Sequence, residues 1–270
     1  MIAALAYEWT RIRTIRSTYW LSVIAIVFGV GLSFLVALGT HLSYGGPDEP
    51  TPSDLRGIGP GLATQFAVFG VPYFVAYILA MVAVFSWGHE YRHGMVRATL
   101  TALSSRTSSW VAKFVVVGLW VVAVALLTML GSILVGWLWL HGHDVPIATG
   151  ATWRTVARTL VYTLLFSWLA AAFTALVRNQ TAALVLLFLW PLAVESVITV
   201  VFQLVPALRD DAELTRFLPF NAGTRIVSQI PKADSAFGDP LSVVGAVVIF
   251  GGLTAIAMAG SFVLLHRRDA

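Results

Sequence analysis

The chain has 270 residues, of which 58% are hydrophobic and 11% are charged, and its formal net charge is +4. Soluble domains carry about 25% charged residues, so much of this protein's surface must face something other than water. Several apolar stretches reach about 20 residues, the length that a helix needs to cross a membrane. The alternation of polar and apolar residues that a membrane β-barrel requires is missing. The chain has no cysteine, which excludes disulfides and thiolate metal sites.

These stretches predict an all-α integral membrane protein, with one transmembrane domain over residues 1–270 and about six transmembrane helices. We place the helices at about 20–39, 62–87, 113–140, 157–177, 181–205 and 241–265. No cleavable signal peptide precedes them, because residues 1–19 carry Glu8 and three arginines and the next apolar run is long enough to span. The even number of spans places both termini on one side.

The basic residues predict which side that is. With the termini inside, the inner segments hold Arg11, Arg13, Arg16, Arg92, Arg97, Arg106, Lys113, Arg178, Arg267 and Arg268. The two short outer loops hold only Arg56, Arg154 and Arg158, and the long segment 206–240 counts less in this rule. We therefore expect both termini in the cytoplasm. The positive charge then reflects topology and not nucleic-acid binding.

The first 19 residues have the pattern of an interfacial helix lying on the membrane. Their apolar residues share one arc at helical spacing: Ile2, Leu5, Trp9, Ile12 and Tyr19. Glu8 and Arg16 interrupt this arc. A solvated, positively charged flank is the alternative interpretation.

The two longer outer segments differ in composition. Residues 40–61 are rich in glycine and proline, which predicts an irregular loop without a long helix. Residues 210–217 and 221–229 each fit a short helix, with Leu218-Pro219-Phe220 as the break between them. Because both are rich in Leu, Phe and Ile, we expect a re-entrant-like helical hairpin in the outer leaflet.

The sequence contains no P-loop. That motif needs a glycine directly before its lysine, and the two lysines of this chain, Lys113 and Lys232, follow Ala112 and Pro231. If ATP drives this protein, a separate polypeptide must bind it.

Residues 88–113, between the second and third predicted spans, concentrate charge that the rest of the chain avoids. In order they contain Glu90, Gly94, Arg97, Thr99-Leu100, Arg106 and Ala112-Lys113. This order resembles the membrane subunits of ABC-2-type exporters, although Met95 stands where that family usually has threonine. A positively charged inner loop with no further role is the alternative.

The resemblance covers essentially the whole chain and implies a bacterial inner-membrane permease. It implies a homodimer, or a pair with a similar permease, that carries two cytoplasmic ATP-binding subunits. The segment after the second span would form a coupling helix that contacts the ATPase, with these coupling residues: Glu90, Arg92, Gly94, Arg97 and Arg106. The partner would bind ATP and Mg²⁺, so this chain would be no enzyme and would hold no cofactor. Its other partner would be membrane lipid.

The family also implies that the second and fifth spans line the translocation path. On the fifth span, Glu195, Ser196, Thr199 and Gln203 fall within about 100° of arc. A carboxylate that faces lipid costs about 3 kcal/mol or more, so this stripe should face protein or a water-filled cavity. Pro191 lies one turn earlier and permits a kink. The alternative is that Glu195 has a structural role, in which a neighbouring group forms a hydrogen bond with its carboxylate.

On the second span, Phe66, Phe69, Tyr73 and Tyr77 follow helical spacing. They are candidates for the same path, with helix packing as the alternative. No metal site is expected, because the outer-loop group of His141, His143 and Asp144 lacks an assured fourth ligand.

We therefore expect the permease of an ATP-driven exporter, in which two copies alternately expose a cavity to either side. The expected substrate is a drug, an antibiotic or a lipid-like molecule, as in multidrug efflux. Two other hypotheses remain: an ATP-independent carrier or channel that uses Glu195 for proton or cation coupling, and a non-transporting membrane scaffold or immunity factor.

Overall fold

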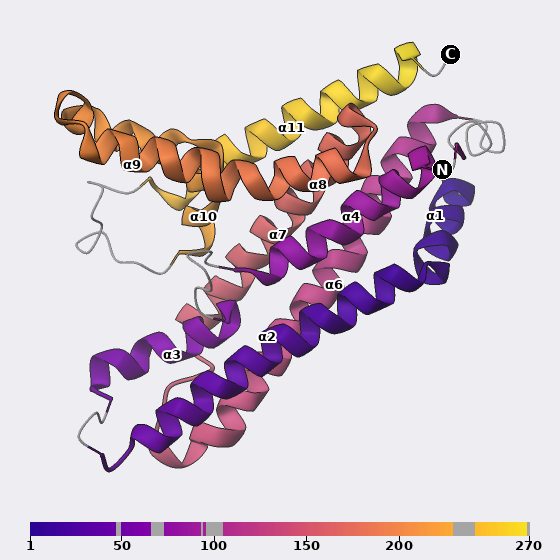
Figure 1. Cartoon of the computed structure of the whole chain (residues 1–270). Coiled ribbons are helices and arrows are strands. Elements are labelled where there is room, and N and C mark those ends of the chain that lie inside the picture. The colour runs from indigo at the N-terminus through magenta and orange to yellow at the C-terminus, as the bar shows by residue number, and fades with distance from the viewer. Residues whose placement is uncertain (47–49, 66–72, 93, 96–104, 229–240, 269–270) are drawn as a thin grey trace.

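The computed structural model describes residues 1–46, 50–65, 73–92, 94–95, 105–228 and 241–268, and every element in this part of the chain is helical (Figure 1). The elements are α1 (Ile2–Thr14), α2 (Arg16–Ser43), α3 (Pro52–Thr64), α4 (Val75–Arg92), α6 (Arg106–Leu140), η1 (His141–His143), α7 (Gly150–Val177), α8 (Gln180–Leu189), η2 (Trp190–Glu195), α9 (Ser196–Leu204), η3 (Pro206–Phe217), α10 (Pro219–Val227) and α11 (Val243–Arg268).

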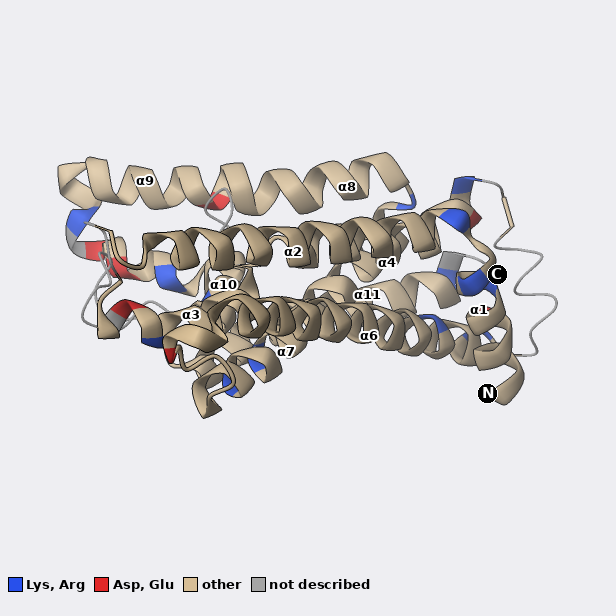
Figure 2. Cartoon of the chain, turned by 90° about the horizontal axis from the view of Figure 1, so that it is seen from below, with Lys and Arg blue, Asp and Glu red and all other residues tan. Residues whose placement is uncertain are grey.

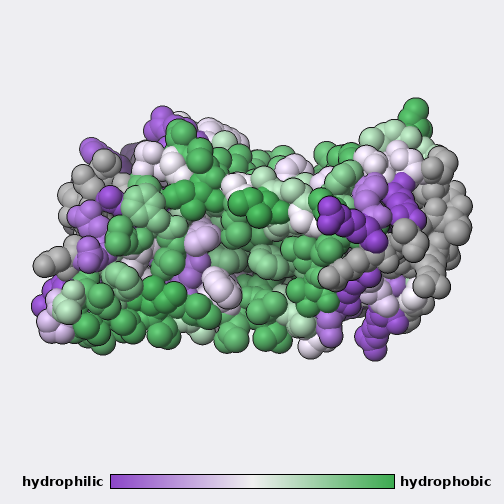
Figure 3. All heavy atoms as spheres, turned by 90° about the horizontal axis from the view of Figure 1, so that it is seen from above, coloured by the Kyte–Doolittle hydropathy of each residue, from purple (hydrophilic) through white to green (hydrophobic). Residues whose placement is uncertain are grey.

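Five helical segments are long and apolar enough to cross a membrane. They are Arg16–Ser43, Arg106–His143, Gly150–Val177, Gln180–Leu204 and Val243–Arg267. Charged residues gather at the two ends of the bundle, and apolar side chains cover the face between them (Figures 2 and 3). The chain is therefore a multi-pass membrane protein, as its composition predicts.

The predicted second span, residues 62–87, is not one of these five. In the described residues it is divided, because α3 ends at Thr64 and α4 begins at Val75. Gln65 takes a left-handed backbone conformation, with φ of 53°, which a helix cannot continue. The polar last turn of α4, from Gly88 to Arg92, lowers the mean hydropathy of that helix. The count of six spans is thus not established.

Helix α4 nevertheless lies at the centre of the bundle. It contacts α2, α6, α7 and α8, and most of its side chains are buried. Its 18 residues span about 27 Å, close to the thickness of a hydrocarbon core.

The expectation of an irregular loop over residues 40–61 is wrong in its second half, where α3 begins. Thr51 and Asp54 form a capping box, in which each side chain accepts a hydrogen bond from the other residue's backbone N–H. Pro52 occupies the first turn, where a missing N–H costs nothing. The glycine and proline content thus predicted an irregular loop at the place where the Thr51–Asp54 capping box starts a helix.

The carboxyl end of α3 is buried, and side chains satisfy its carbonyl groups. Ser33 Oγ of α2 donates to the Leu62 carbonyl at 3.3 Å, and Gln65 Nε2 donates to the Ala63 carbonyl at 3.2 Å. Thr64 Oγ1 bonds the Gly61 carbonyl at 3.2 Å. Irregular backbone inside a membrane protein needs such partners, because lipid supplies none.

The fifth span runs from Gln180 to Leu204, and its middle is the π-helix η2, which contains Pro191. Proline removes one backbone donor, and a π-turn is a common local response. Two short helices, η3 and α10, follow it. Pro219 occupies the first turn of α10 and does not break it, so the break lies at Leu218.

Both termini lie at one end of the bundle (Figure 2). At this end α6 begins and α11 ends, and Arg106 Nη1 donates to the carbonyl oxygen of His266. An arrangement with both termini on one side of a membrane is consistent with this geometry.

Two glycines of α3 provide a matched test of its packing. A Cβ at Gly59 would overlap the carbonyl oxygen of Ile147 and lie 2.6 Å from Oγ1 of Thr152, whereas a Cβ at Gly57 would meet nothing within 4 Å. We expect Gly59→Ala to lower the stability of the protein by about 1–3 kcal/mol, because backbone must move. Gly57→Ala should raise it by about 0.5–1 kcal/mol, because alanine favours helix. Thermal unfolding in detergent measures both, and equal shifts would contradict the packing of α3.

Candidate functional site

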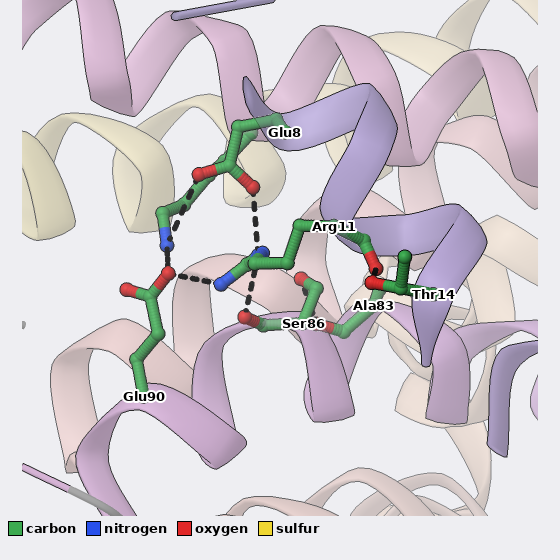
Figure 4. A network of polar contacts seen from close by, with 7 residues as sticks. Glu8, Arg11, Thr14, Ala83, Ser86 and Glu90 are labelled. Carbon is green, nitrogen blue, oxygen red and sulfur yellow. Dashed lines mark hydrogen bonds and ion pairs between the residues drawn. The ribbon is translucent and has the colours of Figure 1, made fainter. Parts of the chain in front are cut away.

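A buried cluster of four charged residues joins three helices at the end of the bundle that holds the termini (Figure 4). Glu8 and Arg11 come from α1, Glu90 from the last turn of α4, and Lys113 from the second turn of α6. Arg11 and Lys113 both pair with Oε1 of Glu90. Glu8 pairs with Arg11 at 2.8 Å and with Lys113 at 3.6 Å. Two carboxylates thus balance two cations.

The side chains of this cluster are largely shielded from solvent. The side chains of Glu8, Glu90 and Lys113 are at most 3% exposed. Arg11 also donates to the carbonyl oxygen of Ser86 at 2.8 Å, and Lys113 Nζ lies 4.7 Å from the centre of the Trp87 ring. Burial raises the pKa of the Glu8 carboxyl, and the charges of Lys113 and Arg11 act in the opposite direction. Breaking such a buried pair costs about 3–5 kcal/mol, because one charge stays uncompensated.

Helical periodicity explains how the cluster assembles. Ala4, Glu8 and Ile12 recur every four residues, and they form the buried face of α1. The helix is confirmed, and the predicted apolar arc is split: Ile12 is buried against the bundle, whereas Ile2 and Trp9 are exposed. The sequence signal that could have predicted the buried ion pair is Glu8, a carboxylate that interrupts the apolar arc of this helix.

The predicted coupling residues have different surroundings. Glu90 belongs to the cluster, and Arg92 is exposed at the end of α4. Gly94 is exposed and has φ of 64°, a conformation that favours glycine. Arg106 begins α6 and contacts α11. Arg97 lies outside the described residues, as does most of the predicted coupling helix.

Glu195, on the fifth span, binds the amino end of α10. Its Oε1 accepts from the Phe220 amide at 3.1 Å and its Oε2 from the Asn221 amide at 2.8 Å. Asn221 Nδ2 also donates to Thr199 Oγ1 at 3.0 Å. The first N–H groups of a helix have no partner within it and carry partial positive charge, so a carboxylate is well placed there.

Most of the described residues that were predicted to line the translocation path are buried within the single chain. Glu195 is 1% exposed and engaged with α10, while Gln203 is half-buried near the end of α9. Tyr73 and Tyr77 are buried, and the Tyr77 ring packs against Phe166 and Phe188 with centroid separations of 4.6 and 5.3 Å. Phe66 and Phe69 lie outside the described residues. A role for these residues in a translocation path stays a prediction.

His143, in the turn after α6, lies beside another histidine. His143 Nε2 lies 2.9 Å from Nδ1 of His41 at the end of α2, and the His143 ring stacks on Tyr44. Within the described ranges, no three His, Cys, Asp or Glu residues are placed to hold a metal ion.

The contact between Glu195 and α10 can be tested with cysteines, because the chain has none of its own. Glu195→Ala removes the acceptor of two buried N–H groups, which should release α10. We expect Ala222→Cys, at a position 0% exposed, to react with a maleimide at least about ten-fold faster in that background. Glu195→Gln keeps one acceptor oxygen and should give a smaller increase.

The control is Ala183→Cys, at a position 1% exposed on α8. It should stay protected in every background, which separates local release of α10 from unfolding. Equal protection of Ala222→Cys with and without the Glu195 carboxylate would overturn its role as the anchor of α10.

Comparison with known proteins agrees with this architecture. The family described as "ABC-2 family transporter protein" matches residues 50–265, most of the chain and all the helices from α3 to α10. A search of curated proteins gave no match. Together with the membrane-crossing helices, the family match shows that this chain is a member of the ABC-2 family of transporter membrane proteins.

Proposed function

We propose that this chain is the permease of an exporter that a separate ATP-binding subunit drives from the cytoplasm. The ABC-2 membership carries the transporter assignment. The observation that carries the coupling mechanism is the cluster of Glu8, Arg11, Glu90 and Lys113. Its Glu90 lies just before the connection between α4 and α6, and its Lys113 lies shortly after it. This connection is where the chain would meet the ATPase.

The cluster acts as a rigid joint in this proposal. Three of its charges, on Glu8, Glu90 and Lys113, are buried, so none of the three helices can move away without leaving an unpaired ion in apolar surroundings. A displacement of residues 90–106 by the ATPase therefore moves α1, α4 and α6 together. Since α4 contacts α2, α7 and α8, the movement reaches the fifth span.

On the outer side, α10 follows the fifth span because Glu195 and Thr199 hold its amino end. We propose that η3 and α10 form the outer closure of a path between two copies of the chain. ATP and Mg²⁺ act on the partner subunit, and the permease itself makes no covalent bond. The exported molecule in this proposal is a drug, an antibiotic or a lipid-like compound, and the setting is a bacterial inner membrane with both termini inside.

The test begins with the partner. The tagged chain is purified from its native cells, and co-purifying proteins are identified by mass spectrometry. We expect a soluble ATPase with a P-loop. In this complex, Mg²⁺, ATP and vanadate should change the maleimide reactivity of Ala222→Cys, which reports movement of α10 without knowledge of the substrate. Absence of any P-loop ATPase, or nucleotide-independent labelling, would rule out the proposal and favour an ATP-independent carrier or a scaffold.

The joint is tested by charge removal. Glu90→Gln leaves Arg11 and Lys113 short of an acceptor and should destabilise the permease by about 3–5 kcal/mol. Adding Lys113→Met restores charge balance and should recover much of that loss in thermal unfolding. We expect the double variant to hydrolyse ATP in the complex while Ala222→Cys no longer responds to nucleotide.

Two charge reversals locate the contact with the ATPase. Arg97→Glu should weaken co-purification of the ATPase, because arginine forms forked hydrogen bonds with acidic groups. Arg267→Glu, at an exposed position on the last turn of α11, is the control and should matter less. If both variants retain the ATPase equally, residues 90–106 are not the coupling segment.

A further inference from the structure

The outward face of α1 is largely exposed, and the contact that the structure gives Trp9 on this face is with the edge of the Trp120 ring. The opposite face, with Ala4, Glu8 and Ile12, packs against the bundle. On the outward face Ile2 is 85% exposed and Trp9 is 42% exposed. Large apolar side chains in this position need a non-aqueous neighbour.

Three aromatic rings meet where α1 and α2 pass α6. The Trp120 ring of α6 lies 6.0 Å from the Trp9 ring and 5.6 Å from the Tyr19 ring, both edge-to-face. The Trp120 indole N–H donates to Ser22 Oγ at 3.0 Å, which fixes the ring. Trp9 and Tyr19 are both more than 40% exposed. Tryptophan and tyrosine concentrate at the boundary between lipid headgroups and acyl chains.

Two arginines flank these rings. Arg13 follows Trp9 by one helical turn on α1, and its guanidinium lies 6.0 Å from the Trp9 ring centre. Arg16 precedes Tyr19 by one turn on α2. Both are exposed, and among the described residues neither forms an ion pair with a carboxylate.

The aromatic faces continue as apolar, exposed surface. Val23 and Val27 lie one and two turns after Tyr19 on the same face of α2, and they are 48% and 65% exposed. On α6, Leu127 lies two turns after Trp120 and is 58% exposed. Since the Tyr19 and Trp120 rings touch, these two apolar faces adjoin.

We propose that these surfaces form a binding site for an anionic glycerophospholipid. Arg13 and Arg16 contact the phosphate and the negative headgroup, because guanidinium matches phosphate geometry. The rings of Trp9, Tyr19 and Trp120 lie beside the glycerol and ester groups. The acyl chains follow the exposed faces of α2 and α6.

A second copy of this chain fits the surface less well. In a two-fold interface the same patch meets itself, so the arginines of the two copies would face each other without carboxylates. The site does not depend on ATP coupling, so it can be tested without the proposed function.

The test uses the full chain in detergent and native mass spectrometry. Phosphatidylglycerol and phosphatidylcholine with the same acyl chains are titrated separately, and the apparent Kd of the first retained lipid is measured. We expect phosphatidylglycerol to bind about 30-fold more tightly, since each arginine near an anionic lipid contributes about five-fold. Arg13→Gln with Arg16→Gln should remove that preference.

Two further variants separate charge from apolar contact. Arg92→Gln with Arg267→Gln removes the same charge from exposed positions near the same end of the bundle and should leave the preference intact. Trp9→Ala should weaken both lipids alike.

Three outcomes would overturn the proposal. The first is an equal affinity of the unsubstituted chain for both lipids. The second is displacement of the lipid by micromolar glycerol 3-phosphate, which would indicate a site for a soluble phosphate. The third is a change of the monomer–dimer ratio in the Arg13 and Arg16 variant without added lipid, which would indicate a protein interface.

Discussion

The constraint on which this structure depends is that a polar group away from water must find its partner inside the chain. Lipid offers no hydrogen bonds, so each buried charge or free backbone group couples segments that are distant in sequence. Glu90 joins α4 to α1 and α6, and Glu195 joins the fifth span to α10. Gln65 and Ser33 complete the end of α3. Most of the helix surface is apolar, and these few polar contacts determine which helix ends are joined to one another.

The two carboxylates lie at different depths, Glu90 in the last turn of α4 and Glu195 within the fifth span, and they have different partners. Glu90 pairs with two cations, Arg11 and Lys113, and so connects α4 to α1 and α6. Glu195 receives two rigid backbone donors, so its contact fixes an orientation of α10. In an ABC-2 transporter, the Glu90 contacts are suited to connect the helices to an ATPase that moves. The Glu195 contacts are suited to hold α10 across the end of a translocation path. We infer that α4 links them, since it contacts the helices on both sides.

The two faces of helix α1 have different surroundings. Its inner face carries Glu8 and Arg11 into the ionic joint, and its outer face presents Trp9 and Arg13 outward. A helix in this position is sensitive both to the protein beneath it and to the lipid around it. A lipid that held the outer face would stabilise the joint, because both faces belong to one rigid element.

The sequence by itself determined the helical class, the membrane setting and the approximate ends of the long apolar helices, because hydropathy is a local property of composition. It also singled out Glu195, since an acid in an apolar run is conspicuous, and the resemblance to ABC-2-type permeases singled out Glu90. It failed at α3, where a capping box outweighed glycine and proline content, and it placed the start of the second span within the last turn of that helix. Only the tertiary structure assigned partners to the acids and an inner face to α1. Partners are long-range, since 79 residues separate Arg11 from Glu90, and no local pattern encodes such a contact.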